Sequence, residues 1–311
     1  MKAVRFYEYG DASVLRYEEA ARPQPRPGEV LVEVAGTSFN PVDAAIRAGY
    51  LQQVFPIRLP HTPGIDVAGT IAELGSDVTG FGVGDPVIGF LPMNEDGAAA
   101  DFVVAAATAL TGAPSSIPLA AAAALPAAGL TAWQALVEHA ALRPGQRVLI
   151  NGAGGGVGGF AVQLAKHAGA VVIATASPRS ADTVRAEGAD QLVDYTSTKL
   201  TDAITEPVDV VLNLVMASEQ DLADFVGLIR PGGVIVTTTS SATDDSERGV
   251  RAISMALRGD AGELATIVDR VDAGQLRVDI SATYPLSEMA AVHQQSAAGE
   301  VRGKVVLVPA L

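Results

Sequence analysis

A glycine-rich segment near the middle of the chain constrains the fold more than any other feature. The apolar stretch Arg147–Asn151 has the character of a buried strand, and Val157–Ala168 has the pattern of a helix. Between them lies a run in which the spacing G-x-G-x-x-G is met by Gly154, Gly156 and Gly159. A strand, such a turn and a helix in this order predict a dinucleotide-binding βαβ unit.

Glycine suits this turn for physical reasons. Without a Cβ it permits a tight turn and lets backbone N–H groups approach a pyrophosphate, and the N-terminus of the helix adds a field that favours the anion. The alternative is a glycine-rich connection that binds no ligand. The residues predicted to contact the cofactor here are Gly152, Ala153, Gly154, Gly155, Gly156, Val157 and Gly158.

The end of the next predicted strand, Val171–Ala176, bears on which nicotinamide dinucleotide is bound. An acidic residue about 20 positions after the turn holds the ribose 2′-hydroxyl in NAD-binding proteins. This chain has Ser177-Pro178-Arg179 there, with no Asp or Glu. Because Ser177 and Arg179 can donate hydrogen bonds to a 2′-phosphate, we expect NADPH. Alternatively, Ser177 caps a helix that starts at Pro178, and Arg179 is a solvated charge.

Two different patterns of strands and helices along the sequence predict two domains of an α/β protein. Short strands with turn signals fill the first third, which predicts a β-rich, barrel-like domain: Val30–Val34, Val67–Leu74, Pro86–Phe90 and Asp101–Ala105. From about residue 120, apolar strands alternate with helices, which predicts a parallel sheet covered on both faces. The final stretch resembles the first third. We therefore expect one discontinuous domain, 1–120 with 265–311, and a dinucleotide-binding domain, 121–264.

Composition excludes several classes of function. The net charge of −14 opposes binding to nucleic acids and anionic membranes. The chain has no cysteine, which removes disulfides, thiolate metal ligands and a cysteine nucleophile. The N-terminus lacks the apolar core of a signal peptide, and Leu119–Leu130 is too short to span a bilayer. We expect a soluble cytoplasmic protein that acts on a small molecule.

Several further motifs resemble one family. They are MKAVRFYEYGDASVL, PRPGEVLVEVAGTSFNPVDAAIRAGY, PGIDVAGTIAELGSDVTGFGVGDPVIG, LPAAGLTAWQAL and PLSEMAAVHQQSAAGEVRGKVVLV. Together with the glycine turn they resemble, nearly end to end, the zinc-independent quinone oxidoreductase (zeta-crystallin-like) branch of the medium-chain dehydrogenase/reductase superfamily. The resemblance implies a GroES-like, β-rich catalytic domain and a Rossmann-type cofactor domain. It also implies a homodimer or homotetramer, with Val234–Thr239 as a candidate edge strand.

The chain departs from the zinc-dependent members of this superfamily. Where they carry Gly-His-Glu, it has Gly64-Ile65-Asp66, and their cysteine ligands are absent. Zinc needs three or four nitrogen, sulfur or oxygen ligands, so the sequence predicts no metal site and a structural role for Asp66. A second departure is Asn213, expected at the cofactor, where many relatives show an acidic residue followed by two glycines.

The resemblance implies three residues near the reacting atoms. Asn40 would orient the substrate or the nicotinamide ribose, or else stabilise a turn before Pro41. Tyr50 would donate to a carbonyl, or else only pack. Thr131 would lie beside the nicotinamide, or else hydrogen-bond the backbone of its own helix.

Further residues are expected at the cofactor. By the resemblance, Tyr195 flanks the adenosine phosphate, although an aromatic residue at a strand end is an equal alternative. Thr238 and Ser240 follow a strand whose carboxyl end faces the ligand crevice in such sheets. Lys304 reaches a cofactor phosphate, or else is solvated.

These observations lead to one functional prediction and two rivals. The prediction is NADPH-dependent hydride transfer to a quinone or an α,β-unsaturated carbonyl compound, with the proton supplied by water or the Tyr50 hydroxyl. One rival is an enoyl-thioester reductase, which would need a basic entrance that the sequence does not display. The other is a protein that binds NADPH without catalysis.

Overall fold

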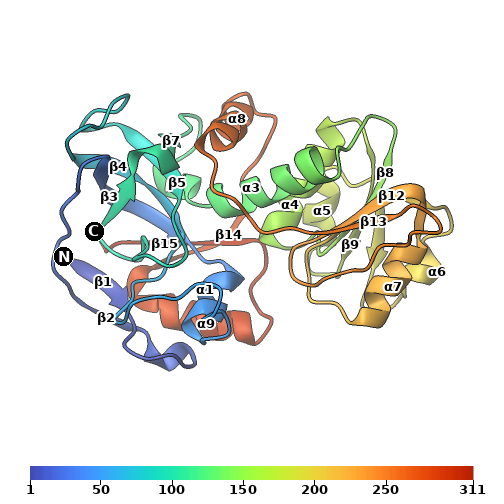
Figure 1. Cartoon of the computed structure of the whole chain (residues 1–311), viewed down its shortest axis with the longest axis horizontal. Coiled ribbons are helices and arrows are strands. Elements are labelled where there is room, and N and C mark those ends of the chain that lie inside the picture. Colours follow the sequence, from blue (N-terminus) through green and yellow to red (C-terminus); the bar gives the residue numbers. More distant parts are fainter. Residues whose placement is uncertain (311) are drawn as a thin grey trace. The chain divides into compact units, whose positions relative to one another are not determined.

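The structure is a computed structural model that describes residues 1–310, and the chain divides into two compact units (Figure 1). Unit 1 comprises Met1–Leu130, Gly259–Gly274 and the residues from Val278 onward; unit 2 comprises Thr131–Arg258 and Gln275–Arg277. The divisions after Leu130 and Arg258 differ from those expected at residues 120 and 264. The brief return of the chain to unit 2 at Gln275–Arg277 was not expected from the sequence.

Unit 2 is built on a six-stranded parallel sheet. Its strands lie in the order β10-β9-β8-β11-β12-β13. They are β8 (Arg147–Asn151), β9 (Val171–Ala176), β10 (Gln191–Asp194), β11 (Val208–Asn213), β12 (Ile229–Thr237) and β13 (Arg251–Ser254). The predicted Rossmann-type sheet is confirmed, but the predicted edge strand is wrong. Residues 234–237 of β12 pair with β13, a strand that the polar flanking sequence concealed.

The strands of this sheet are apolar along their length because both faces are covered. Leu149, Ile173, Val211 and Ile235 are all fully buried in one core cluster. The helices of unit 2 are α4 (Gly156–His167), α5 (Ala181–Ala186), α6 (Leu200–Ala203) and α7 (Glu219–Gly227). A π-helical turn, η3 (Gln134–His139), continues from α3 (Pro126–Trp133).

Two buried glutamines hold unit 2 at the places where the chain leaves it. Gln134 Nε2 donates to the Arg258 carbonyl at 2.8 Å, and Arg258 N–H donates to Gln134 Oε1 at 3.1 Å. Gln163 of α4 repeats this two-way contact with Arg277, at 3.1 and 2.8 Å. Each glutamine side-chain amide both donates to and accepts from the backbone of one residue, as a neighbouring strand would. These contacts satisfy the N–H and C=O groups of Arg258 and Arg277, which lie outside the sheet.

Unit 1 contains a mainly antiparallel sheet in the order β14-β15-β3-β4-β5-β7, with β6 paired to β3, and a separate hairpin of β1 and β2. Only β14 and β15 run parallel within it. The strands are β1 (Lys2–Arg5), β2 (Arg16–Glu19), β3 (Glu29–Ser38), β4 (Asp66–Leu74), β5 (Pro86–Phe90), β6 (Phe102–Ala106), β7 (Leu110–Gly112), β14 (Ile280–Pro285) and β15 (Lys304–Val308). The C-terminal strands thus join the sheet begun by the first third.

Short helices complete unit 1. They are α1 (Pro41–Arg47), α2 (Leu119–Ala122), α8 (Ala261–Asp272) and α9 (Met289–Ala297), with single 3-10 turns η1 (Ala12–Val14), η2 (Ala107–Ala109) and η4 (Leu286–Glu288). One apolar core lies between β3, β4, β5 and β6, and a second lies under α9. Among residues 1–310, no helix is both long and apolar enough to cross a membrane.

Candidate functional site

The glycine turn of unit 2 requires glycine at three defined positions. Gly152 has φ +91°, in the left-handed region, and a Cβ there would lie 2.7 Å from Val215 Cγ1. A Cβ on Gly154 would lie 2.5 Å from Ser180 Oγ, and one on Gly158 would lie 2.4 Å from the Ala153 carbonyl oxygen. Carbon atoms normally stay about 3.5 Å or more from such neighbours, so the turn excludes larger residues.

These positions shift the register predicted from the sequence. Gly156 is the first residue of α4, and a Cβ on Gly159 would meet only the Glu187 side chain. The close backbone contact falls on Gly158 instead. The glycine that packs against the turn is therefore Gly158, one residue before the Gly159 that completes the predicted spacing.

The N-terminus of α4 is suited to an anion. Gly155 is its N-cap and has no side chain to bond the first amides, and the first turn carries no acidic residue. The first N–H groups of a helix lack partners within the helix, and together with the helix dipole they attract negative charge. The turn can therefore accept a diphosphate.

The residues after β9 form an exposed turn. The Ser177 carbonyl accepts hydrogen bonds from Ser180 N–H at 2.9 Å and Ala181 N–H at 3.0 Å. Ser180 is the N-cap of α5, so the alternative that Ser177 caps a helix starting at Pro178 is wrong. Ser177 is half-buried and Arg179 is exposed, whereas Ser180 is buried.

The other residues expected at the cofactor lie at the carboxyl ends of strands. Tyr195 follows β10 and is 56% exposed. Asn213 ends β11 with its side chain fully buried, and the half-buried Thr238 donates its N–H to the Asn213 carbonyl at 3.2 Å. The Ser240 hydroxyl accepts from Ala217 N–H at 3.3 Å. Of these, Tyr195 alone presents a largely exposed side chain.

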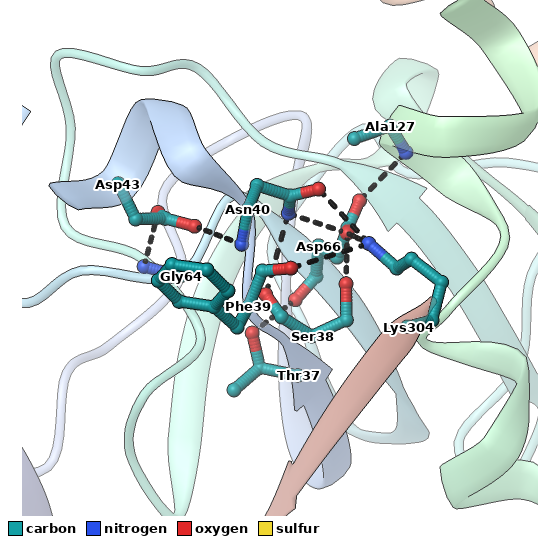
Figure 2. A network of polar contacts seen from close by, with 9 residues as sticks. All are labelled: Thr37, Ser38, Phe39, Asn40, Asp43, Gly64, Asp66, Ala127 and Lys304. Atoms are coloured by element: carbon teal, nitrogen blue, oxygen red, sulfur yellow. Dashed lines mark hydrogen bonds and ion pairs between the residues drawn. The ribbon is translucent and has the colours of Figure 1, made fainter. Parts of the chain in front are cut away.

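A buried polar cluster in unit 1 joins Asn40 to Lys304 (Figure 2). Lys304 Nζ donates to Asn40 Oδ1 at 2.9 Å and lies 3.5 Å from Asp66 Oδ2. Asn40 Nδ2 donates to the same Asp66 oxygen at 2.8 Å, and the Ser38 hydroxyl donates to it as well. The other Asp66 oxygen accepts from Ala127 N–H at 2.7 Å, at the start of α3. Asp66 thus has the structural role expected from the sequence.

This cluster occupies the groups that a ligand would need. Lys304 is 3% exposed, and its ammonium also donates to the Phe39 carbonyl at 3.4 Å. An ammonium has three donors, so these contacts use its full capacity. Asn40 is 8% exposed, and both ends of its amide are engaged. The structure thus places both residues in a packed cluster rather than at an open surface.

The cluster holds two buried carboxylates and one ammonium. Asp43 accepts from Asn40 N–H and Gly64 N–H, each at 3.1 Å. Burial, reinforced by the charge of Asp66, raises the pKa of Asp43 to about 7. Burial also lowers the pKa of Lys304, opposed by the charges of Asp66 and Asp43. Asp43 was not predicted, although its position three residues after Asn40 is the spacing of a capping box.

The two remaining predicted residues differ in exposure. Tyr50 is 83% exposed in unit 1, just after α1. Thr131 is 9% exposed on α3, at the first position of unit 2. The Tyr50 side chain is open to solvent, whereas Thr131 is enclosed. Across residues 1–310, no three His, Asp or Glu side chains gather in a way that could hold a metal ion.

Comparisons with known proteins agree with this architecture. Residues 26–115 match the family model of the alcohol dehydrogenase GroES-like domain, and residues 187–307 match that of zinc-binding dehydrogenases. A chloroplast envelope quinone oxidoreductase homolog of Arabidopsis thaliana is 32% identical, over 99% of this chain and 98% of that protein.

Solved structures give the same result. A quinone oxidoreductase from Coxiella burnetii is 32% identical, with a TM-score of 0.91 and coverage of 100% of this chain and 99% of that one. A mycobacterial protein in complex with NADPH is 27% identical, with a TM-score of 0.87 and coverage of 99% and 100%. The chain therefore belongs to the quinone oxidoreductases of the medium-chain dehydrogenase/reductase superfamily.

Proposed function

We propose that this oxidoreductase uses NADPH to reduce quinones or α,β-unsaturated carbonyl compounds without a metal. The observation that carries the proposal is the glycine turn after β8, where the N-terminus of α4 has no side-chain cap and no acidic residue in its first turn. The mycobacterial relative in complex with NADPH supports the choice of cofactor class.

The turn after β9 supports the phosphorylated form of the cofactor. Ser177 and Arg179 can donate to a 2′-phosphate, and residues 174–179 hold no carboxylate. Asp194 ends β10 beside Ala176, but its Oδ1 already accepts from Thr196 N–H at 2.9 Å and Thr196 Oγ1 at 2.6 Å. We propose that Arg179 supplies the charge that favours NADPH over NADH.

The chemistry divides between the cofactor and the protein. When bound, NADPH supplies a hydride to the electrophilic carbon of the acceptor. The glycine turn holds the pyrophosphate, and Ser177 and Arg179 orient the adenosine end. We assign delivery of the proton to the acceptor oxygen to water or to the exposed Tyr50 hydroxyl.

A substrate panel tests this proposal. Purified protein is mixed with NADPH and a series of quinones and enones, and the loss of nicotinamide absorbance is followed. A parallel series offers NADP⁺ and simple alcohols. We expect turnover in the first series and none in the second. Turnover of alcohols alone, or NADPH binding without consumption by any acceptor, would contradict the proposal.

We also propose a homodimer formed through β13. This strand is last in the order of the unit 2 sheet, and an edge strand can pair with another copy of itself. Light scattering measures the assembly directly. A monomer at micromolar concentration, or a dimer that survives proline substitution at Ile253, would contradict pairing through this edge.

A further inference from the structure

A continuous series of hydrogen bonds crosses the carboxyl ends of three neighbouring strands in unit 2. Gly152 N–H donates to Thr175 Oγ1 at 2.8 Å, and the Thr175 hydroxyl donates to Asn151 Oδ1 at 3.1 Å. Asn151 Nδ2 donates to Asn213 Oδ1 at 2.8 Å, and Asn213 Nδ2 donates to the Val215 carbonyl at 2.8 Å. We call these five residues the strand-end chain.

The three side chains in the middle of the strand-end chain are buried, and their hydrogen bonds have one self-consistent arrangement. Thr175 is 1% exposed, Asn151 8% and Asn213 0%. Thr239 Oγ1 also donates to the Val215 carbonyl, at 2.7 Å, so that this oxygen uses both lone pairs. Breaking either of the two buried links, Thr175–Asn151 or Asn151–Asn213, leaves a buried donor or acceptor without a partner, which costs about 1–3 kcal/mol. The strand-end chain is therefore a rigid connection between Gly152 and Val215.

The two ends are the glycine turn and the loop after β11. Gly152 opens the turn with its left-handed φ of +91°, and its Cα is packed so closely that a Cβ would lie 2.7 Å from Val215 Cγ1. Val215 and the next residue, Met216, are 39% and 78% exposed. The Gly152 N–H is thus engaged by Thr175 and is not available to a ligand. Gly152 also packs against the Val215 side chain of the loop.

We propose that Thr175, Asn151 and Asn213 are positioning residues for the dinucleotide. These three side chains fix Gly152 so that the later N–H groups of the turn face the pyrophosphate, a role that rests on the proposed function. They also hold the loop at Val215 beside the turn. The three side chains are uncharged, so this support places no negative charge behind an anion site. A carboxylate at position 213 has no N–H and could not donate to the Val215 carbonyl.

Removing one hydroxyl tests the proposal. Thr175→Val keeps the shape of the side chain but leaves Gly152 N–H without its acceptor, and Thr175→Ser restores the hydroxyl. In titrations of NADPH fluorescence we expect Thr175→Val to raise the Kd about tenfold and Thr175→Ser to stay within about threefold of the wild type. The kcat at saturating NADPH stays unchanged. Thr70→Val, on β4 of unit 1, is the matched control and leaves the Kd unchanged.

Amide hydrogen exchange at Gly152 reports the link itself. We expect faster exchange in Thr175→Val and protection regained in Thr175→Ser. Asn213→Leu is the second variant; it removes the links to Asn151 and Val215, and we expect a higher KM for NADPH. A folded Thr175→Val with faster Gly152 exchange and wild-type affinity would overturn the positioning role alone. A wild-type protein that binds no NADPH would instead overturn the proposed function.

Discussion

The sharpest single perturbation of the cofactor site is Gly158→Ala. The new Cβ would lie 2.4 Å from the Ala153 carbonyl oxygen and 2.5 Å from its carbonyl carbon and Cα. That is about 1 Å inside ordinary contact distance, and the obstacle is backbone, which cannot rotate away. Overpacking of this kind costs about 1–3 kcal/mol.

The structure can relieve this strain only by moving the turn away from α4. If the displaced turn binds the pyrophosphate less well by this whole amount, a loss of about 1–3 kcal/mol in binding free energy raises the Kd for NADPH roughly 5- to 150-fold. NADPH fluorescence titration measures the Kd, and urea unfolding separates lost affinity from lost stability. The expected result is a large rise in Kd in a protein that still unfolds cooperatively.

Two further substitutions serve as controls for the register of the turn. Gly159→Ala meets Glu187 Oε1 at 2.5 Å, which is the end of a flexible side chain, so its Kd should stay within about threefold of wild type. Gly227→Ala, at the end of α7, meets nothing within 4 Å and should leave the Kd unchanged. Wild-type affinity in Gly158→Ala together with a large loss in Gly159→Ala would refute the reasoning.

Three other predictions concern charge. Lys304→Met leaves Asp66 buried without its ammonium partner and should lower the free energy of unfolding by about 3–5 kcal/mol. The double variant Lys304→Met with Asp66→Asn should regain part of this free energy. An unchanged urea midpoint in Lys304→Met would contradict the prediction. Asp43 has a folded pKa of about 7, above its ordinary 3.8, so the unfolded chain releases this proton first as pH rises. Relative to Asp43→Asn, the free energy of unfolding of the wild type should therefore fall by up to about 4 kcal/mol between about pH 4 and 7, and the difference should stay constant above pH 7. Parallel pH profiles of the two proteins would contradict this prediction. Arg179→Glu should lower the ratio of kcat/KM for NADPH over NADH at least about tenfold, and an unchanged ratio would exclude Arg179 from cofactor selection.

The parallel sheet and the glycine turn were predictable because their signals are local. Apolar runs such as Val208–Asn213 and a strand–turn–helix order follow from burial on both faces and from the steric needs of a few consecutive residues. The exception was β13, where Arg251–Ser254 carries little apolar signal. It is a strand because β12 offers it an unpaired edge, which is a property of the assembled sheet.

The roles of single polar residues were less predictable because their partners are distant in the sequence. The sequence predicts a solvated or phosphate-binding Lys304, yet its ammonium contacts Asn40 and Asp66, which are distant in the sequence. Only the pairing of β15 with β3 brings the ammonium to these groups. The same applies to Asn213, whose amide is completed by Asn151 from the neighbouring strand.

The sequence by itself determined that this chain forms a dinucleotide-binding turn on a parallel sheet, because glycine spacing and apolar periodicity act over a few residues. Tertiary structure alone decided that Gly158 bears the close contact, that Asn40 and Lys304 are held in a buried cluster, and that Asn213 supports the turn. Hydrogen bonds and excluded volume act over about 3 Å, so such roles exist only after folding has brought distant residues together.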